Sequence, residues 1–334
     1  MLEQFKEKRI LVTGAAGFIG SHIVETLLND GAKFVRIMDN LSTGKIENIK
    51  HLLDKYDNLE FICEDIRNYE SCVKAVKDID LVCHQAAIGS IPRSIVDPMT
   101  THTSNVDGFI NILHAAKEAG IKRFVYASSS SVYGDDKHLP KQEEHIGKQL
   151  SLYAVSKYVD ELYAYIYCLH YGMECIGLRY FNVFGPRQNP DGPYAAVIPK
   201  FITQMKNGEG PIINGDGSYS RDFTFVKNIV QANINALTTE NKECFGQAFN
   251  IGTGTNITIL QLHNNINKIL ETDIKPIFNI IRKGDVPHSL ADISKAERML
   301  GYKVLVSFYD GLNETIKLTK FSDKLKMHAQ HATS

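Results

Sequence analysis

The chain has 334 residues, of which 43% are hydrophobic and 22% are charged, and these are the proportions of an ordinary globular protein. Its formal net charge of −1 gives no electrostatic basis for binding nucleic acid or an anionic membrane surface. No apolar run reaches the length of a membrane span, so we expect a cytoplasmic protein with neither a nucleic-acid nor a membrane partner.

The spacing of cysteine and histidine gives no sign of a metal site. The six cysteines are scattered without a Cys-x-x-Cys pair, and the twelve histidines form no His-Glu-x-x-His motif. We therefore expect buried, reduced thiols and no bound metal.

Short β-branched runs alternate with longer amphipathic stretches in the first half of the chain. The predicted strands are 9–13, 34–38, 59–63, 81–84, 124–127 and 176–178, and the predicted helices are 20–30, 69–77, 104–119 and 153–171. Apolar strands separated by helices are typical of a parallel sheet covered on both faces. The predicted fold class is α/β, a Rossmann-like doubly wound parallel sheet with its ligand at the carboxyl ends of the strands.

The texture of the sequence changes after about residue 180, where turn-rich segments separate predicted helices at 197–207, 227–237 and 258–270. We expect residues 1–180 to form the sheet domain and residues 181–321 to form mainly a smaller lobe, with some segments returning to the first domain. The polar end, residues 322–334, is expected to be a tail.

A glycine-rich turn follows the first predicted strand. Gly14, Gly17 and Gly20 are spaced Gly-x-x-Gly-x-x-Gly, with Phe18 and Ile19 inside the motif and a helical pattern beyond it. Such glycines let the backbone approach a pyrophosphate, which then lies on the N–H groups at the helix N-terminus. Alone, the motif is weak evidence, because a glycine-rich turn can be only a turn.

An acid at the end of the second predicted strand supports a dinucleotide. Asp39 lies about 20 residues beyond the last glycine, where a carboxylate accepts hydrogen bonds from the ribose hydroxyls. Its charge disfavours the 2′-phosphate of NADP, so we predict NAD as the cofactor, although Asp39 could instead be a turn former. The other expected cofactor contacts are Asn40, Ser42, Thr43, Gly44, Asp65, Ile66, Gln85, Ala86, Ala87 and Tyr180.

A tyrosine and a lysine open the long helical stretch after residue 151. Tyr153 and Lys157 are four positions apart, so both side chains project from one helix face. A phenol ordinarily titrates near ~10, and an adjacent ammonium group favours its ionised form. The alternative is an amphipathic helix whose lysine reaches solvent. Four serines, 128–131, end the preceding strand and could hydrogen-bond the same substrate oxygen, or form only a turn.

Together these motifs resemble the extended short-chain dehydrogenase/reductase superfamily, over roughly residues 8–318. The segments that carry the resemblance are 14–20, 39, 104–108, 128–134, 153–157, 178–187, 221–223 and 284–286. Within that superfamily the chain is most similar to the nucleotide-sugar epimerases, and in particular to bacterial UDP-N-acetylglucosamine 4-epimerases, through segments 89–94, 194–200 and 284–289.

The resemblance implies a role for each matching residue. Ser129 would be the catalytic hydroxyl, assisted by Ser130, with Tyr153 as the base and Lys157 as its modulator. The implied UDP-sugar contacts, besides these, are Gly89, Ser90, Asn182, Ala196, Val197, Lys200, Asn214, Arg221, Arg282, Asp285 and Ser289. Both arginines suit a phosphate, because a guanidinium offers a planar fork, but they could equally form surface ion pairs.

The implied reaction is reversible C4 epimerisation of UDP-N-acetylglucosamine to UDP-N-acetylgalactosamine, through a transient 4-keto sugar, with NAD retained and regenerated. UDP-glucose and UDP-galactose are further expected substrates, because Ser289 would lie near C2 of the sugar, where a small residue leaves room for either substituent. Ser289 could instead line a turn and touch no ligand. The implied assembly is a homodimer formed through two helices of each subunit, with 104–119 and 153–171 as the expected pair.

Other reactions of the superfamily remain open. The stretch 128–133 lacks the Thr-Asp-Glu triplet of the 4,6-dehydratases and the glutamate usual in the decarboxylases. A UDP-glucuronate 4-epimerase or decarboxylase, a dehydratase, and a catalytically silent NAD-binding module are the alternatives.

Overall fold

The structure is a computed structural model that describes residues 3–191, 195–281 and 286–319. Its centre is a seven-stranded parallel sheet in the order β11-β6-β5-β4-β1-β2-β3. The strands are β1 (Arg9–Thr13), β2 (Phe34–Met38), β3 (Leu59–Ile62), β4 (Leu81–His84), β5 (Arg123–Ser129), β6 (Glu174–Tyr180) and β11 (Gln247–Ile251). The chain leaves β1 toward β2 on one side and later returns to β4 on the other. This reversal opens a crevice at the carboxyl ends of β1 and β4.

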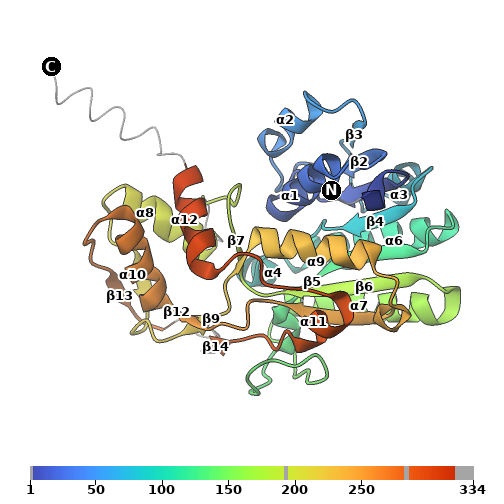
Figure 1. Ribbon diagram of the computed structural model, residues 1–334. Coiled ribbons are helices and arrows are strands. Elements are labelled where there is room, and N and C mark those ends of the chain that lie inside the picture. The colour runs from blue at the N-terminus through green and yellow to red at the C-terminus, as the bar shows by residue number, and fades with distance from the viewer. Residues whose placement is uncertain (1–2, 192–194, 282–285, 320–334) are drawn as a thin grey trace.

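Helices cover both faces of the sheet (Figure 1). The helices α1 (Phe18–Asn29) and α9 (Val226–Thr238) pack together on one face, and α3 (Tyr69–Val76), α6 (Gly108–Glu118) and α7 (Leu152–Tyr171) lie on the other. Along β1, Ile10 and Val12 enter the first hydrophobic cluster and Leu11 enters the second, since successive side chains of a strand point to opposite faces. We call the sheet and these helices the sheet unit.

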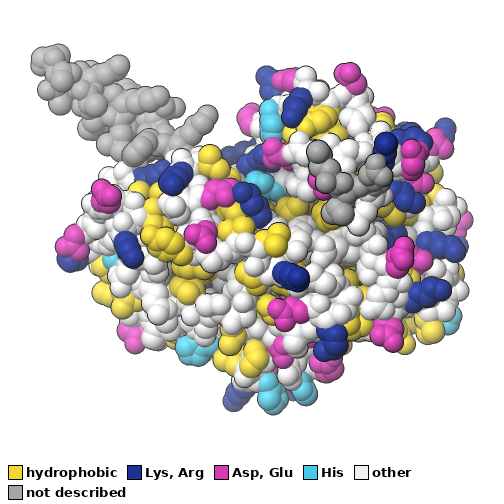
Figure 2. Space-filling view, viewed as in Figure 1, with side chains coloured by type: hydrophobic (Ala, Val, Ile, Leu, Met, Phe, Trp, Pro, Cys, Tyr) yellow, Lys and Arg dark blue, Asp and Glu magenta, His cyan; other side chains and the backbone are white. Residues whose placement is uncertain are grey.

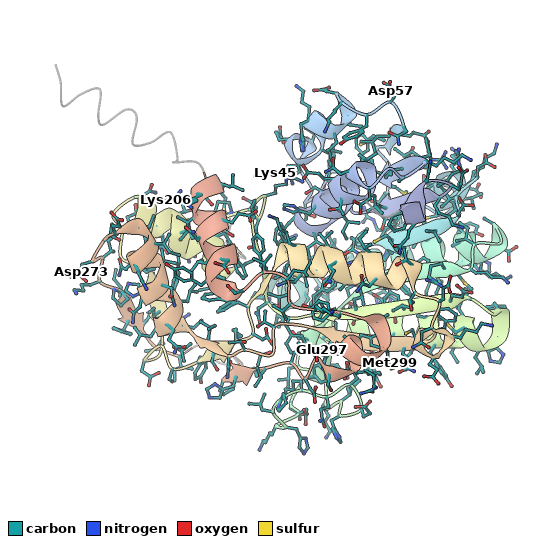
Figure 3. All side chains as sticks on the ribbon, in the orientation of Figure 1. Lys45, Asp57, Lys206, Asp273, Glu297 and Met299 are labelled. Carbon is teal, nitrogen blue, oxygen red and sulfur yellow. The ribbon has the colours of Figure 1, made fainter. Side chains whose placement is uncertain are left out.

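A smaller unit lies beside the carboxyl ends of the strands (Figure 1). It contains three small sheets, β10-β7, β12-β9-β14 and β13-β8. Its elements are β7 (Val183–Phe184), α8 (Val197–Lys206), β8 (Ile212–Asn214), β9 (Ser220–Arg221), β10 (Thr224–Phe225), β12 (Ile257–Thr258), α10 (Ile259–Leu270), β13 (Ile277–Asn279), β14 (His288–Ser289) and α12 (Phe308–Leu318). Lys206, labelled in Figure 3, joins α8 to α12 by donating to the carbonyls of Ile316 and Thr319.

The remaining elements are short. They are α2 (Lys50–Leu53), α4 (Ile91–Val96), α5 (Pro98–His102) and α11 (Ser294–Leu300), a π-helical turn at Thr103–Asp107, and 3₁₀ turns at Glu3–Phe5, Ile46–Asn48, Ser130–Tyr133 and Lys242–Cys244. No helix within the described ranges combines the length and the apolar character needed to cross a membrane. On the face shown in Figure 2, positive and negative side chains are interspersed.

A buried ion pair and a hydrogen bond join α7 to β6 and β5. The Arg179 guanidinium on β6 donates to both carboxylate oxygens of Glu161 on α7, at 2.9 and 2.8 Å, and Ser128 at the end of β5 donates to the same carboxylate at 2.5 Å. Charge-assisted, bidentate pairs of this kind are directional as well as strong. The middle of α7 is therefore held in a fixed place against β5 and β6.

The predicted fold class is confirmed, and the six predicted strands and seven predicted helices are present, with shifts of a few residues at their ends. The predicted helix 104–119 is divided between the π-helical turn Thr103–Asp107 and α6. The sequence did not predict β11, which forms one edge of the sheet. Both β11 and α9 come from the segment 181–321 and belong to the sheet unit. The division of the chain at residue 180 stays a prediction, and the predicted tail 322–334 lies outside the described residues.

Candidate active site

A cavity of about 770 Å³ opens at the carboxyl ends of the central strands. Its wall includes every residue that the sequence predicted for the cofactor: Gly14, Gly17, Phe18, Ile19, Gly20, Asp39, Asn40, Ser42, Thr43, Gly44, Asp65, Ile66, Gln85, Ala86, Ala87, Tyr153, Lys157 and Tyr180. These residues come from five strand ends and two helices, so the fold gathers one site from points far apart in the chain.

The turn between β1 and α1 has no room for side chains at two of its glycines. A Cβ atom on Gly14, whose φ is 66°, would lie 2.6 Å from the backbone nitrogen of Ala86, and one on Gly20 would lie 2.2 Å from the carbonyl oxygen of Gly14. This tightness brings the first N–H groups of α1, which begins after Gly17, to the cavity wall. Unpaired N–H groups at a helix N-terminus attract a pyrophosphate, so the turn fits the diphosphate of a dinucleotide.

Asp39 links the end of β2 to that turn. Its carboxylate accepts the N–H of Ala16 at 3.0 Å and the N–H of Leu41 at 2.8 Å, and the residue is 9% exposed. Burial raises the pKa of this carboxyl group, and the two backbone hydrogen bonds oppose that shift. Each carboxylate oxygen has a second lone pair that can accept from a ribose hydroxyl.

Asp65 forms the neighbouring part of the wall. Its carboxylate accepts a hydrogen bond from the Asn40 amide at 2.8 Å and forms an ion pair with Arg67 at 2.7 Å. The Arg67 contact, followed by the Asn40 bond, lowers the pKa of Asp65 to about 2. An ionised carboxylate thus borders the cavity beside Asp39 at neutral pH.

Tyr153 and Lys157 lie in the first turns of α7. The hydroxyl of Ser151 caps this helix by accepting the N–H of Ala154 at 3.1 Å, which fixes where the helix begins. Both predicted catalytic side chains line the cavity, and Lys157 is only 2% exposed. The structure therefore brings the tyrosine–lysine pair to the predicted cofactor residues.

Asn105 fixes the loop after β4 against α7. This fully buried amide accepts the N–H of Ile88 at 2.7 Å and donates to Ser156 Oγ at 3.0 Å. Ser90, on the same loop, lines the cavity. Its φ of 107° is a strained conformation for a residue other than glycine. The Ser90 hydroxyl accepts a hydrogen bond from the N–H of Arg93, which helps to hold this conformation.

The serine run places its members differently. Ser128 lines the cavity, but its hydroxyl is committed to Glu161. Ser129 caps the following 3₁₀ turn by accepting from the N–H and the hydroxyl of Ser131, at 3.2 and 2.9 Å. Ser129 and Ser130 are half-buried and are not among the residues that line the cavity.

The predicted UDP-sugar contacts fall into two groups. Gly89, Ser90 and Ala196 line the cavity with Tyr153. The second group consists of Asn182, Val197, Lys200, Asn214, Arg221 and Ser289, which lie beyond the sheet unit and outside the cavity wall. The predictions for Arg282 and Asp285 fall outside the described residues.

Two members of that second group are neighbours. Arg221 on β9 and Ser289 on β14 are register partners in a parallel ladder. The Arg221 guanidinium donates to the carbonyls of Ser220 and Pro287 at 2.8 and 3.1 Å, which fixes the direction of its planar fork.

Comparison with known proteins identifies the family of the chain. The model of the NAD dependent epimerase/dehydratase family matches residues 10–252. The chain belongs to that family. It is 38% identical to a putative UDP-glucose 4-epimerase of Methanocaldococcus jannaschii, over 94% of this chain and 99% of the relative.

Solved structures of family members have the same fold. A UDP-N-acetylglucosamine 4-epimerase from Methanobrevibacter ruminantium M1, in complex with UDP-N-acetylmuramic acid, superposes with a TM-score of 0.88 at 41% identity, covering 93% of this chain and 97% of that one. A UDP-glucuronic acid 4-epimerase from Bacillus cereus, in complex with UDP-glucuronic acid and NAD, gives 0.86 at 34% identity, covering 93% and 98%. The chain is thus an enzyme of the NAD-dependent UDP-sugar epimerase family, with NAD as its cofactor.

The sequence prediction missed part of the cavity wall. Arg93, Ser104, Arg187, Gln188 and Asn189 line it as well, together with Lys45, which Figure 3 labels on the side of the sheet unit that faces the smaller unit. Arg93 and Arg187 lie within segments that carry the family resemblance, so the sequence marked both segments as important. The resemblance did not indicate that these two side chains reach the cavity.

The close packing of the turn between β1 and α1 leads to a prediction about NAD binding. Gly20→Ala would press a methyl group against fixed backbone, and such overpacking typically costs about 1–3 kcal/mol, so we expect bound NAD to fall roughly ten-fold or more. NAD released on denaturation measures this. Gly120→Ala is the control, because Gly120 has a φ of 75° but open space around it, so that variant should lose stability and keep its NAD. Equal NAD contents in the two variants would contradict this account of the turn.

Proposed function

We propose that this enzyme interconverts UDP-N-acetylglucosamine and UDP-N-acetylgalactosamine by inversion at C4, and that it also accepts UDP-glucose and UDP-galactose. The observation that carries the proposal is the placement of Tyr153 and Lys157 on the wall of the NAD cavity, next to a strand end that bears hydroxyl groups and no acid. A dehydratase needs an acid to protonate the departing hydroxyl, so this strand end favours epimerisation. The similarity to a UDP-N-acetylglucosamine 4-epimerase supports the choice of sugar.

Bound NAD would supply the group that accepts a hydride from C4 of the sugar and returns it. Gly14, Gly17 and Gly20 would hold its pyrophosphate, and Asp39 its ribose. Tyr153, as phenolate, removes the proton of the 4-hydroxyl, and Lys157 favours that ionised form. Ser129, assisted by Ser130, donates a hydrogen bond to the 4-keto oxygen after a local rotation of its hydroxyl, and Tyr153 returns the proton once the sugar has presented its other face.

The UDP moiety would be held mainly by the smaller unit. The oriented fork of Arg221 suits a diphosphate. Asn182 and Asn214 complete the predicted set, together with Arg282 and Asp285, which lie outside the described residues. Val197 and Lys200 at the start of α8 would line the same side. Holding the UDP apart from the reacting carbon lets the 4-keto sugar turn without leaving the enzyme.

The second candidate is a 4-epimerase of UDP-glucuronate, which the similarity to the Bacillus cereus enzyme favours. Incubation with UDP-N-acetylglucosamine, UDP-glucose and UDP-glucuronate separately, followed by product analysis, decides between the candidates. A decarboxylated or 4-keto-6-deoxy product would instead indicate one of the other reactions of the superfamily. All six cysteines are unpaired thiols, which fits the cytoplasmic location that we propose.

We propose a homodimer formed through α7 and the neighbouring α4–α5. Apolar side chains are exposed along both, at Ile95, Val96 and Met99 and at Leu162 and Ile166. Contiguous exposed apolar surface marks an interaction site. Segment 104–119, the other helix that the resemblance implies, carries none of the exposed large apolar side chains recorded for the described residues, and its part in the interface stays a prediction. We expect a dimer in sedimentation analysis and its dissociation by Leu162→Glu. A native chain that sediments as a monomer would overturn the proposal.

The role of Tyr153 leads to a prediction about turnover. Tyr153→Phe removes only the ionisable oxygen, so the fold and bound NAD should be retained while kcat falls by about 10²–10⁴, the usual cost of a lost positioned base. Steady-state rates with UDP-N-acetylglucosamine and the NAD content of both proteins measure this. Native-like epimerisation by the variant would remove Tyr153 from the mechanism.

The proposed role of Ser289 leads to a prediction about substrate choice. Ser289→Tyr would fill the space beside C2, and overpacking a formed site typically costs about 1–3 kcal/mol. We expect kcat/KM to fall for UDP-N-acetylglucosamine and to be kept or raised for UDP-glucose, because the smaller substrate needs less room. Equal losses on the two substrates, or no change on either, would place the C2 wall elsewhere.

A further inference from the structure

The ammonium group of Lys157 has a buried partner that the proposed mechanism does not use. Asp160, three residues further along α7, accepts from Lys157 Nζ at 3.1 Å through Oδ2. Asp160 is fully buried, and its other oxygen, Oδ1, has no hydrogen-bond partner. A carboxylate is expensive to bury, so a buried acid on the catalytic helix whose one contact is the catalytic lysine calls for a physical explanation.

The other titratable groups around this pair are committed or neutral. On α7, Glu161 is bound by Arg179 and Ser128. From β5, the buried phenol of Tyr126 faces the pair, and burial raises its pKa well above the ordinary value. From β4, His84 bonds Thr13, and burial, helped by the charge of Lys157, lowers its pKa to about 3. The neutral ring of His84 and the neutral phenol of Tyr126 leave Asp160 to balance the charge of Lys157.

We propose that Asp160 is a positioning residue, which anchors the ammonium group of Lys157 at the cavity wall and offsets part of its charge, so that Tyr153 ionises at a higher pH than an unbalanced lysine would set. The inference rests on the roles of Tyr153 and Lys157 in the proposed function. It does not depend on which UDP-sugar is the substrate.

Two physical effects follow from this arrangement. A lysine side chain has a flexible four-carbon stem, and an ion pair at its end selects one of its conformations. A negative charge beside the ammonium also weakens the field that favours phenolate at Tyr153. Asp160 therefore fixes the position of the lysine and, at the same time, weakens the activation of Tyr153.

The protonation state of Asp160 couples to that of Tyr153. Burial raises the pKa of Asp160 to about 7, although the contact with Lys157 pulls it down. Because this value lies above the ordinary one, neutral Asp160 stabilises the fold at low pH, and that contribution is lost as the pH rises to about 7. In the native enzyme the acid limb of the pH–rate profile should thus be broad, since two interacting groups titrate along it.

The first test replaces the charge and keeps the shape. In Asp160→Asn the acid limb of kcat/KM should become a single ionisation and move to lower pH by roughly 0.5–1 unit. The same shift should appear without substrate in the near-ultraviolet absorbance of tyrosinate, taken as the difference between each protein and its Tyr153→Phe counterpart. Glu314→Gln removes one charge from the ion pair between α12 and Lys227 at the start of α9, and should leave both titrations unchanged.

A second test needs no activity. Lys157→Met leaves Asp160 as a buried acid without its ion-pair partner, so the melting temperature should fall more steeply between about pH 5 and about pH 9 than that of the native protein. Adding Asp160→Asn to Lys157→Met should remove that extra pH dependence. The double variant thereby tests the pair even if Asp160→Asn alone folds poorly.

The results that overturn the proposal are specific. In Asp160→Asn, a tyrosinate titration that coincides with the native one or moves to higher pH would show that Asp160 does not offset the charge of Lys157. Persistence of the steep pH dependence in the double variant would show that the two side chains do not act as a pair. Failure of the proposed substrate would change neither the tyrosinate titration nor the melting curves, so the two failures are distinguishable.

Discussion

The site depends first on how closely the backbone approaches itself where β1 turns into α1. Gly20 lies against the carbonyl of Gly14, and Gly14 lies against the loop after β4, so three segments meet with no side chain between them. That contact brings the N-terminus of α1, the end of β2 through Asp39 and the end of β4 through Ala86 to one wall. A methyl group at either glycine would separate the segments that make the cavity.

The side of the cavity that Tyr153 and Lys157 line depends on α7, and two buried ion pairs of this helix have different effects. Glu161 faces the strands and, with Arg179, fixes where the helix lies. Asp160, the adjacent residue, contacts the lysine that lines the cavity. Side chains at neighbouring positions on a helix point about 100° apart. One helical turn can therefore hold both an acid that binds the strands and an acid that binds the lysine at the cavity. The amide of Asn105 adds a third attachment, because it joins the same helix to the loop after β4.

Much of this architecture could be predicted from the sequence, since local patterns carry it. Continuous apolar runs between helices specify a buried parallel strand, and β1, β2 and β4 were predicted to the residue. The edge strand β11 was missed because Gln247 and Asn250 interrupt its apolar run. Much of the cavity wall was predictable, because its residues follow strand ends. By contrast, Arg187 and Gln188 reach the cavity from a segment after β7, and Asp160 turns toward Lys157 rather than toward solvent. Both facts depend on how distant elements pack, which local patterns do not encode.

The ladder that carries Arg221 and Ser289 has a further consequence. β9 and β14 are held by main-chain hydrogen bonds and by the backbone carbonyls that Arg221 contacts, so their pairing depends little on which side chain stands at position 289. Mutations there can accumulate without disturbing the folding of the ladder or the wall of the cavity. If Ser289 has the role that we propose, an ancestral enzyme with this layout could give rise to lineages that recognise different sugars while the tyrosine, the lysine and the glycine turn stay unchanged.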